Sequence, residues 1–159
     1  MPADSPKRIL PITWGQVDQM LDIVLAGMHA KDHGFDTVIA IGGGGIIPAS
    51  MLVYKYAKQI GKSIAIHPIW ARSYKGQEQG SLRVDWPLPL EEMRRRWDQG
   101  STLIVDDICD TGRTLQTFTH TFPKAATLVL VNKVPLLPDF AGTIDDSQEF
   151  WYQFPWETT

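Results

Sequence analysis

The stretch from Leu103 to Thr114 constrains the fold strongly, because a buried strand must lead there into a loop that carries carboxylates. An apolar run of strand length ends in the adjacent acids Asp106 and Asp107, and a short turn brings in a third acid, Asp110. Apolar runs bounded by turn residues are typical of strands in a parallel sheet. We therefore expect an α/β fold with an open, mainly parallel sheet flanked by helices.

The residues after the acids have the chemistry of an anion site. Thr111, Gly112, Arg113 and Thr114 open a new helix and offer hydroxyls and free backbone N–H groups to an anion. Asp106 and Asp107 can accept hydrogen bonds from sugar hydroxyls a few residues away. An ordinary strand, Asp turn and helix cap would also give this sequence, although a cap needs one acid and not three. The pairing predicts a ribose phosphate as ligand.

A second candidate cradle follows an earlier strand at 37–41. It is a run of four residues, Gly42, Gly43, Gly44 and Gly45. The run precedes Ile46 and Ile47, and Pro48 is placed for the first helical turn, so the backbone N–H groups at a helix N-terminus are unobstructed. A flexible turn is the other interpretation of such a run.

Composition limits the function classes. The chain has 159 residues, 43% of them hydrophobic and 21% charged, and a net charge of -3. Such a composition predicts one globular domain and gives no bulk electrostatic reason to bind nucleic acid or an anionic membrane. No apolar run approaches the roughly 20 residues needed to span a bilayer, and the first residues lack a signal-type apolar core. We expect a cytoplasmic enzyme or binding protein.

Cysteine and histidine give no metal pattern. The single cysteine, Cys109, can form no internal disulfide and no zinc site alone, and no local sequence marks a base that would activate it as a nucleophile. The four histidines have no metal-ligand spacing. Hydrophobic periodicity and turn residues predict helices at about 13–34, 49–60, 87–99 and 115–121, and strands at about 9–12, 63–70 and 126–131, the last being the final buried strand.

The stretch from Leu103 to Thr114 resembles the phosphoribosyl-diphosphate (PRPP) signature of the type I phosphoribosyltransferases, in which apolar residues precede two acids and a Thr-Gly-x-Thr loop. The resemblance implies the type I phosphoribosyltransferase fold in one domain over residues 1–159, with a small hood from about 1–14 and 135–159. It also implies that Asp106 and Asp107 bind the ribose hydroxyls, directly or through water on Mg²⁺. Asp110 would be the catalytic acid facing N7 of a purine, and 110–114 would bind the 5'-phosphate.

Further segments resemble the bacterial xanthine-guanine and hypoxanthine phosphoribosyltransferases. Lys133 matches the lysine that binds the oxygen on C6 of the base, although a lone lysine there is most often a solvated end residue. Trp151 matches the tryptophan that covers the purine, and the backbone of Tyr152 would read the C2 substituent. Aromatic residues near a terminus can instead simply pack a lid onto the core.

Two loops carry the rest of the resemblance. Ser73 and Tyr74 match the Ser-Tyr pair of a flexible lid, for which an ordinary surface hairpin is the alternative. The run 42–45 corresponds to the diphosphate loop, which reads Ser-Arg-Gly-Gly in the xanthine-guanine enzymes, so this chain lacks the arginine. Arg72 and Arg83 lie near the lid in sequence, and the sequence does not decide which basic residue reaches the ligand.

The resemblance implies a purine phosphoribosyltransferase that transfers 5-phosphoribosyl from PRPP to a 6-oxopurine, uses Mg²⁺ and releases diphosphate. Its partners would be these small molecules and other copies of the chain, in a dimer or tetramer. Two alternatives stay open. The chain could be a PRPP or nucleotide sensor of the same fold without turnover, or an enzyme for a pyrimidine or another acceptor.

Overall fold

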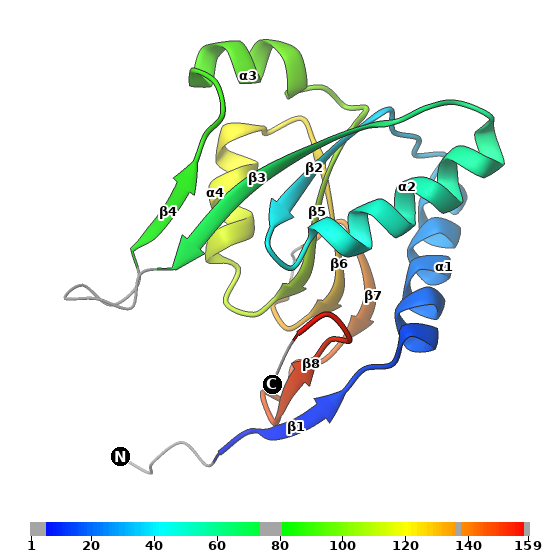
Figure 1. Cartoon of the computed structure of the whole chain (residues 1–159), viewed down its shortest axis with the longest axis vertical. Helices are drawn as coiled ribbons and strands as arrows, with labels where there is room; N and C mark the ends of the chain where they lie inside the picture. The colour runs from blue at the N-terminus through cyan, green and yellow to red at the C-terminus, as the bar shows by residue number, and fades with distance from the viewer. Residues whose placement is uncertain (1–5, 74–80, 136–137, 158–159) are drawn as a thin grey trace.

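Across residues 6–73, 81–135 and 138–157, which the computed structural model describes, a six-stranded sheet forms the centre of the molecule (Figure 1). Its strands are β2 (Thr37–Gly42), β3 (Ala65–Ser73), β4 (Leu82–Asp85), β5 (Thr102–Cys109), β6 (Ala126–Asn132) and β7 (Phe140–Ile144). They lie in the order β4-β3-β2-β5-β6-β7, and only the β3–β4 pair is antiparallel. The predicted open, mainly parallel sheet is confirmed.

Helices cover both faces of this sheet, and two apolar clusters result. The helices are α1 (Trp14–Ala30), α2 (Ile46–Ile60), α3 (Leu90–Trp97) and α4 (Arg113–Thr121). Side chains of α1 and α2 pack on one face, and those of α3 and α4 pack on the other. All seven residues of β6 are buried, as expected for a parallel strand covered on both sides.

The sheet order indicates where a ligand site is expected. From β2 the chain moves outward to β3 and β4, whereas β5, β6 and β7 extend the sheet in the other direction. The order therefore reverses between β2 and β5. Open α/β sheets bind ligands outside the carboxyl ends of the strands at such a reversal. The glycine run follows β2 at this point, and the acids lie at the end of β5.

A separate two-stranded parallel sheet joins the two ends of the chain. It consists of β1 (Arg8–Pro11) and β8 (Phe150–Gln153), with Ile9 opposite Trp151 and Leu10 opposite Tyr152. After β8, the Trp156 ring stacks on Phe154 with centroids 4.9 Å apart and also contacts Trp14 at 5.8 Å. Helix α1 begins with a capping box, in which Thr13 and Gln16 form reciprocal hydrogen bonds.

Several predicted boundaries were wrong. Strand β5 does not end before the acids but continues to Cys109, because β6 continues to pair with it as far as Asn132. Helix α3 begins only at Leu90, since Pro89 holds an extended backbone as its N-cap. The strand at 126–131 is fully buried as predicted, and the mostly half-buried β7, which was not predicted, adds a parallel strand beyond it.

Other helices also differ from prediction. Helix α1 ends at Ala30 and not near Gly34, α2 already begins at Ile46, and α4 begins two residues before Leu115. No helix in the described part of the chain is both long and apolar enough to cross a membrane.

Candidate functional site

Two adjacent carboxylates mark the inner end of the site. Asp106 and Asp107 are consecutive residues of β5, so their side chains leave opposite faces of the strand. Burial raises the pKa of the Asp106 carboxyl well above its ordinary value, and the neighbouring Asp107 charge adds to this. Burial also raises the pKa of Asp107, which is only 8% exposed. Because burial disfavours the charged form of both carboxyls, hydroxyl donors or a cation bound beside them would stabilise that form.

The glycine run lies directly against Asp107. A Cβ placed on Gly44 would stand 2.7 Å from Asp107 Oδ1 and closer still to the rest of the carboxylate. A Cβ on Gly45 would meet the carbonyl oxygens of Val105 and Ile41 at 2.5 and 2.6 Å. The two glycines therefore let the loop after β2 approach the end of β5. The structure brings the predicted diphosphate loop and the predicted ribose acids into contact.

The first two glycines have a different neighbour. A Cβ on Gly42 would lie 2.8 Å from ring carbons of Trp70, which is opposite Gly42 in the β2–β3 register. A Cβ on Gly43 would meet the same ring at 3.4 Å, an ordinary van der Waals contact. The peptide between Gly42 and Gly43 is cis. Sequence reasoning missed Trp70, although an aromatic residue near the carboxyl end of the neighbouring strand was a visible signal.

The predicted phosphate loop joins β5 to α4. Gly112 is the residue that caps α4, and its φ of 84° lies in the left-handed region that favours glycine. Thr111 Oγ1 accepts a hydrogen bond from the Arg113 N–H at 3.4 Å. The next N–H groups belong to the first turn of α4, where a helix has no internal partners for them. Thr111, Arg113 and Thr114 are thus grouped around a helix N-terminus that can bind an anion.

Lys133 connects this loop with β8. Its side chain is almost completely buried, and Nζ donates a hydrogen bond to the Phe150 carbonyl oxygen at 2.7 Å. Nζ also lies 3.8 Å from Asp110 Oδ1 and 5.6 Å from the centre of the Tyr152 ring. The interpretation of Lys133 as a solvated end residue is wrong, because its side chain is buried and its ammonium group has fixed partners, as a buried charge requires.

The C-terminal segment approaches the acids from the other side. Tyr152 is buried, and its hydroxyl donates to Asp145 at 2.7 Å; burial raises the Tyr152 pKa to about 12. The Trp156 indole nitrogen is buried and completes no hydrogen bond with the described residues, yet it lies close enough to Asp107 to lower the pKa of that carboxyl against the effect of burial. The structure thus adds Trp156 and Asp145 to the residues found by sequence.

Trp151 differs from its neighbours in β8. Its side chain is 56% exposed, whereas the Tyr152 side chain is directed into the core. A large exposed aromatic side chain that directly follows Phe150, the hydrogen-bond partner of Lys133, is available to a flat ligand. The stacking role of Trp151 stays a prediction.

The lid is described only at its beginning. The backbone of Ser73 ends β3 and pairs with Leu82 of β4, and Tyr74 lies outside the described residues. Lid closure is therefore also still a prediction.

The environment of Cys109 disfavours a nucleophilic thiolate. It is buried at the end of β5, and burial raises the pKa of its thiol to about 11, with the nearby Asp106 and Asp110 charges adding to the shift. The reactive form of cysteine is the thiolate, which such an environment disfavours. The structure gives no support to a catalytic thiol.

His67 is a packed ring, since it stacks on Trp97 with centroids 4.5 Å apart.

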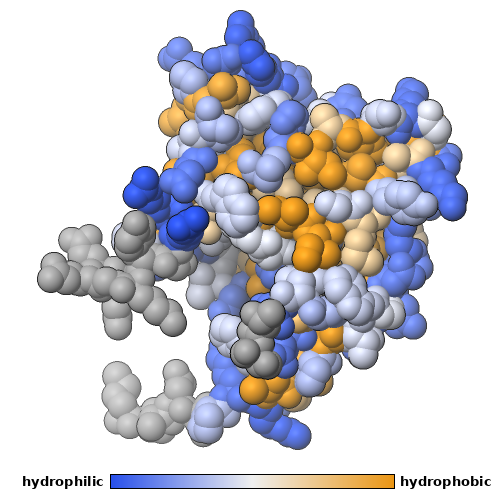
Figure 2. Space-filling view, in the orientation of Figure 1, coloured by the Kyte–Doolittle hydropathy of each residue, from blue (hydrophilic) through white to orange (hydrophobic). Residues whose placement is uncertain are grey.

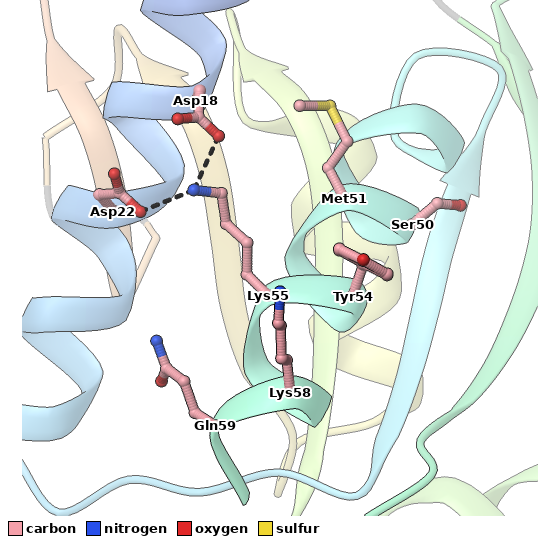
Figure 3. A pocket seen from close by; sticks show the side chains of 8 residues that line it. All are labelled: Asp18, Asp22, Ser50, Met51, Tyr54, Lys55, Lys58 and Gln59. Carbon is pink, nitrogen blue, oxygen red and sulfur yellow. Dashed lines mark hydrogen bonds and ion pairs between the residues drawn. The ribbon is translucent and has the colours of Figure 1, made fainter. Parts of the chain in front are cut away.

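A groove of about 660 Å³ lies elsewhere, between α1 and α2 (Figure 3). In it the Lys55 ammonium reaches Asp18 and Asp22 at 2.7 and 2.8 Å, and hydrogen bonding to these acids raises the pKa of Lys55. Exposed Tyr54 lies beside Lys58 on the same side of α2. None of the residues predicted to form the site lines this groove.

Known proteins are similar to this chain over nearly its whole length. No model of a protein family matches the chain. A xanthine-guanine phosphoribosyltransferase of Desulfotalea psychrophila is 28% identical, with 98% of this chain and 91% of the relative aligned, and that of Chromohalobacter salexigens is 26% identical, with 99% and 89% aligned.

A solved structure has the same fold. The crystal structure of purine phosphoribosyltransferase from Pyrococcus horikoshii superimposes with a TM-score of 0.72 at 25% sequence identity, covering 94% of this chain and 95% of the other. Both matches extend over nearly the whole chain. The chain therefore has the fold of the type I phosphoribosyltransferases and is similar in sequence to bacterial xanthine-guanine phosphoribosyltransferases.

Proposed function

We propose that this chain transfers the 5-phosphoribosyl group from PRPP to a ring nitrogen of a 6-oxopurine and releases diphosphate. One observation supports this assignment most directly. Lys133 is buried with its ammonium group fixed between the Phe150 carbonyl oxygen and the Asp110 carboxylate. A fixed donor at this place can bind an exocyclic oxygen on C6 of a base whose N7 faces Asp110. Adenine carries an amino group at that position, and its N–H donors would face the N–H donors of Lys133 without an acceptor between them.

The other end of the proposed ligand would be bound by the two cradles. Gly42–Gly45 at the start of α2 would bind the diphosphate, and Thr111–Thr114 at the start of α4 would bind the 5'-phosphate. In sequence, Asp106 and Asp107 lie between these two loops, and Gly44 contacts Asp107. They would accept from the ribose hydroxyls. The sugar would thus be held with its C1 directed toward the base.

The reaction breaks the bond between C1 and the diphosphate oxygen, and the diphosphate leaves with the electron pair. A ring nitrogen of the purine then forms the new bond to C1, and the purine loses a proton. The transition state resembles an oxocarbenium ion, so the acids near the ribose stabilise developing positive charge while the cradle stabilises the leaving group. Asp110 would take or hold the proton at N7.

Magnesium fits this donor set. Each acid of the pair accepts one backbone N–H through Oδ1, from Asp107 to Asp106 and from Ile108 to Asp107. Among the described residues no group of three or more His, Cys, Asp or Glu could enclose a metal ion. We propose that Asp106 and Asp107 hold Mg²⁺ through water. When bound, Mg²⁺ would neutralise charge on the diphosphate.

The β1–β8 sheet is our candidate for the hood over the base. It carries Trp151 on its exposed side and supplies the Phe150 carbonyl oxygen to Lys133. Trp151 would stack on the purine, the Tyr152 backbone would contact the C2 substituent, and Ser73 with Tyr74 would begin the lid. We further propose a cytoplasmic homo-oligomer with one such site in each copy.

The test is an assay of diphosphate release and 5'-nucleotide formation with PRPP, Mg²⁺ and separate bases. We expect turnover with guanine, xanthine or hypoxanthine, and at least a hundredfold lower kcat/KM with adenine. Preferred turnover of a pyrimidine would contradict the role of Lys133 and Trp151.

A sensor without turnover is the second candidate, because the glycine run lacks the arginine of the enzymes that it resembles. Tight PRPP binding with no diphosphate release for any base would favour the sensor over the enzyme. Such a result would leave the ligand geometry in place and remove only the transfer step.

A further inference from the structure

The glycine run offers a diphosphate backbone N–H groups but no charged side chain. At three of its positions a side chain would not fit, because Trp70 lies over Gly42 and the end of β5 packs against Gly44 and Gly45. Only Gly43 has room for a side chain, because a Cβ there meets nothing closer than 3.4 Å. In the resembling enzymes this is the position of the arginine. The charge that Gly43 lacks must come from elsewhere if the loop is to hold a diphosphate tightly.

Arg72 lies where such a charge can act. In β3, Arg72 follows Trp70 by two residues, so the two side chains leave the same face of the sheet about 7 Å apart. The Trp70 ring lies on Gly42, which places this face of β3 beside the loop. Arg72 extends beyond the last β2 pair, Gly42 with Trp70, toward the edge where α2 begins. It is exposed, and no ion pair is recorded for it within the described residues.

Among the described residues, the nearby cations Arg83, Lys133 and Arg113 have other partners or positions. Arg83 lies opposite Arg72 in the β3–β4 register and donates to Asp85 Oδ1 at 3.1 Å. Lys133 donates a hydrogen bond to Phe150 where the purine base would bind, and Arg113 is the first residue of α4, where the 5'-phosphate would bind. Figure 2 shows strongly hydrophilic side chains over β4 and the adjoining end of β3, next to the hydrophobic surface of α2. Arg72 lies in β3 two residues after Trp70, which pairs with Gly42 of the loop.

We propose that Arg72 binds the diphosphate of PRPP and takes the place of the missing loop arginine at Gly43. This inference rests on the proposed function. A guanidinium on β3 has the reach of a long side chain and can donate two parallel hydrogen bonds to phosphate oxygens. Trp70 and Arg72 then form one unit, in which Trp70 occupies the space above Gly42 and Arg72 supplies charge at the edge of that space.

The test compares Arg72→Gln with Arg95→Gln, which removes the same charge from an exposed position on α3. Calorimetry measures the affinity of each variant for inorganic diphosphate with Mg²⁺, and for GMP, which has the 5'-phosphate but no diphosphate. We expect Arg72→Gln to weaken diphosphate binding roughly tenfold to hundredfold and GMP binding less than twofold. The KM for PRPP should rise more than kcat falls. Arg95→Gln should match the wild type.

A rescue variant separates direct binding from a folding effect. Adding Gly43→Arg to Arg72→Gln returns the arginine to the loop, where a Cβ fits, and should recover most of the diphosphate affinity. Equal diphosphate affinity in Arg72→Gln and Arg95→Gln would overturn the inference, as would an equal loss of GMP binding. If the wild type binds diphosphate but turns over no base, the proposed enzyme fails while these affinities still decide the role of Arg72. If the wild type binds no diphosphate, both are wrong.

Discussion

The contact between Gly44 and Asp107 gives the sharpest prediction. Gly44→Ala would place a methyl group within 2.7 Å of Asp107 Oδ1 and nearer to the other carboxylate atoms, so either the loop or the acid must move. The φ of Gly44 is not positive, so alanine suits its backbone and only space is in question. Overpacking of this kind costs about 1 to 3 kcal/mol. For a domain of this size we expect a melting temperature lower by roughly 2 to 10 °C.

A double variant isolates the cause. In the Asp107→Ala background the obstructing carboxylate is absent, so adding Gly44→Ala should cost less than about 0.5 kcal/mol. Chemical denaturation of the wild type, both single variants and the double variant measures this coupling. Gly100→Ala is the matched control, because a Cβ at Gly100 meets nothing within 4 Å.

Activity should follow the same geometry. A displacement of the acid or the loop by about 1 Å can lower a rate on the order of a hundredfold, so kcat/KM for PRPP should fall steeply in Gly44→Ala. The reasoning is refuted if Gly44→Ala and Gly100→Ala have the same stability, or if the cost of Gly44→Ala is unchanged by the removal of Asp107.

Four further variants test individual roles. Gly112→Ala forces a φ of 84° on an L-residue, so unfolding should become easier by about 1 to 2 kcal/mol and GMP should bind more weakly; an unchanged denaturation midpoint would argue against this geometry. Trp151→Ala should weaken purine binding by about 1 to 3 kcal/mol in a calorimetric titration while leaving PRPP affinity unchanged, and equal purine affinity would remove Trp151 from the site. Asp110→Asn should lower kcat at least tenfold, whereas a change under about threefold would end its proposed proton role. Because the Cys109 pKa is about 11, only about one thiol in a thousand is ionised at pH 8. A thiol reagent should therefore label the native protein far more slowly than the unfolded one, and Cys109→Ala should keep its transfer rate. Fast labelling of the native protein would contradict the burial of this thiol.

The sheet could be foreseen from sequence where strands are buried on both faces. Strands β2, β5 and β6 are apolar runs between turn residues, and helices between such runs favour a parallel sheet. Strand β7 could not be foreseen. Its sequence, Phe-Ala-Gly-Thr-Ile, is short and contains a glycine, and it is stabilised by pairing with β6, a contact that no local pattern encodes.

The site was partly predictable for a related reason. The motif that includes Asp106 and Gly112 is continuous in the chain, so a short pattern reveals it. Contacts between separate segments are invisible in such a pattern. The approach of Gly44 to Asp107, of Trp70 to Gly42 and of Trp156 to Asp107 each joins elements that are far apart in sequence. The burial of Lys133 likewise depends on Phe150, which returns in β8.

These contacts change what the glycine run means. From sequence alone, four glycines suggest a loop that has lost its function, and that appearance is the main support for a sensor. In the structure, Gly42 is glycine because Trp70 lies above it, and Gly44 and Gly45 are glycine because the end of β5 lies against them. The difference from an enzyme loop is then confined to Gly43, one missing side chain with space for it. A loop that keeps its backbone approach to Asp107 and lies beside Arg72 retains the means to bind a diphosphate, so the absent arginine alone is a weak argument against turnover.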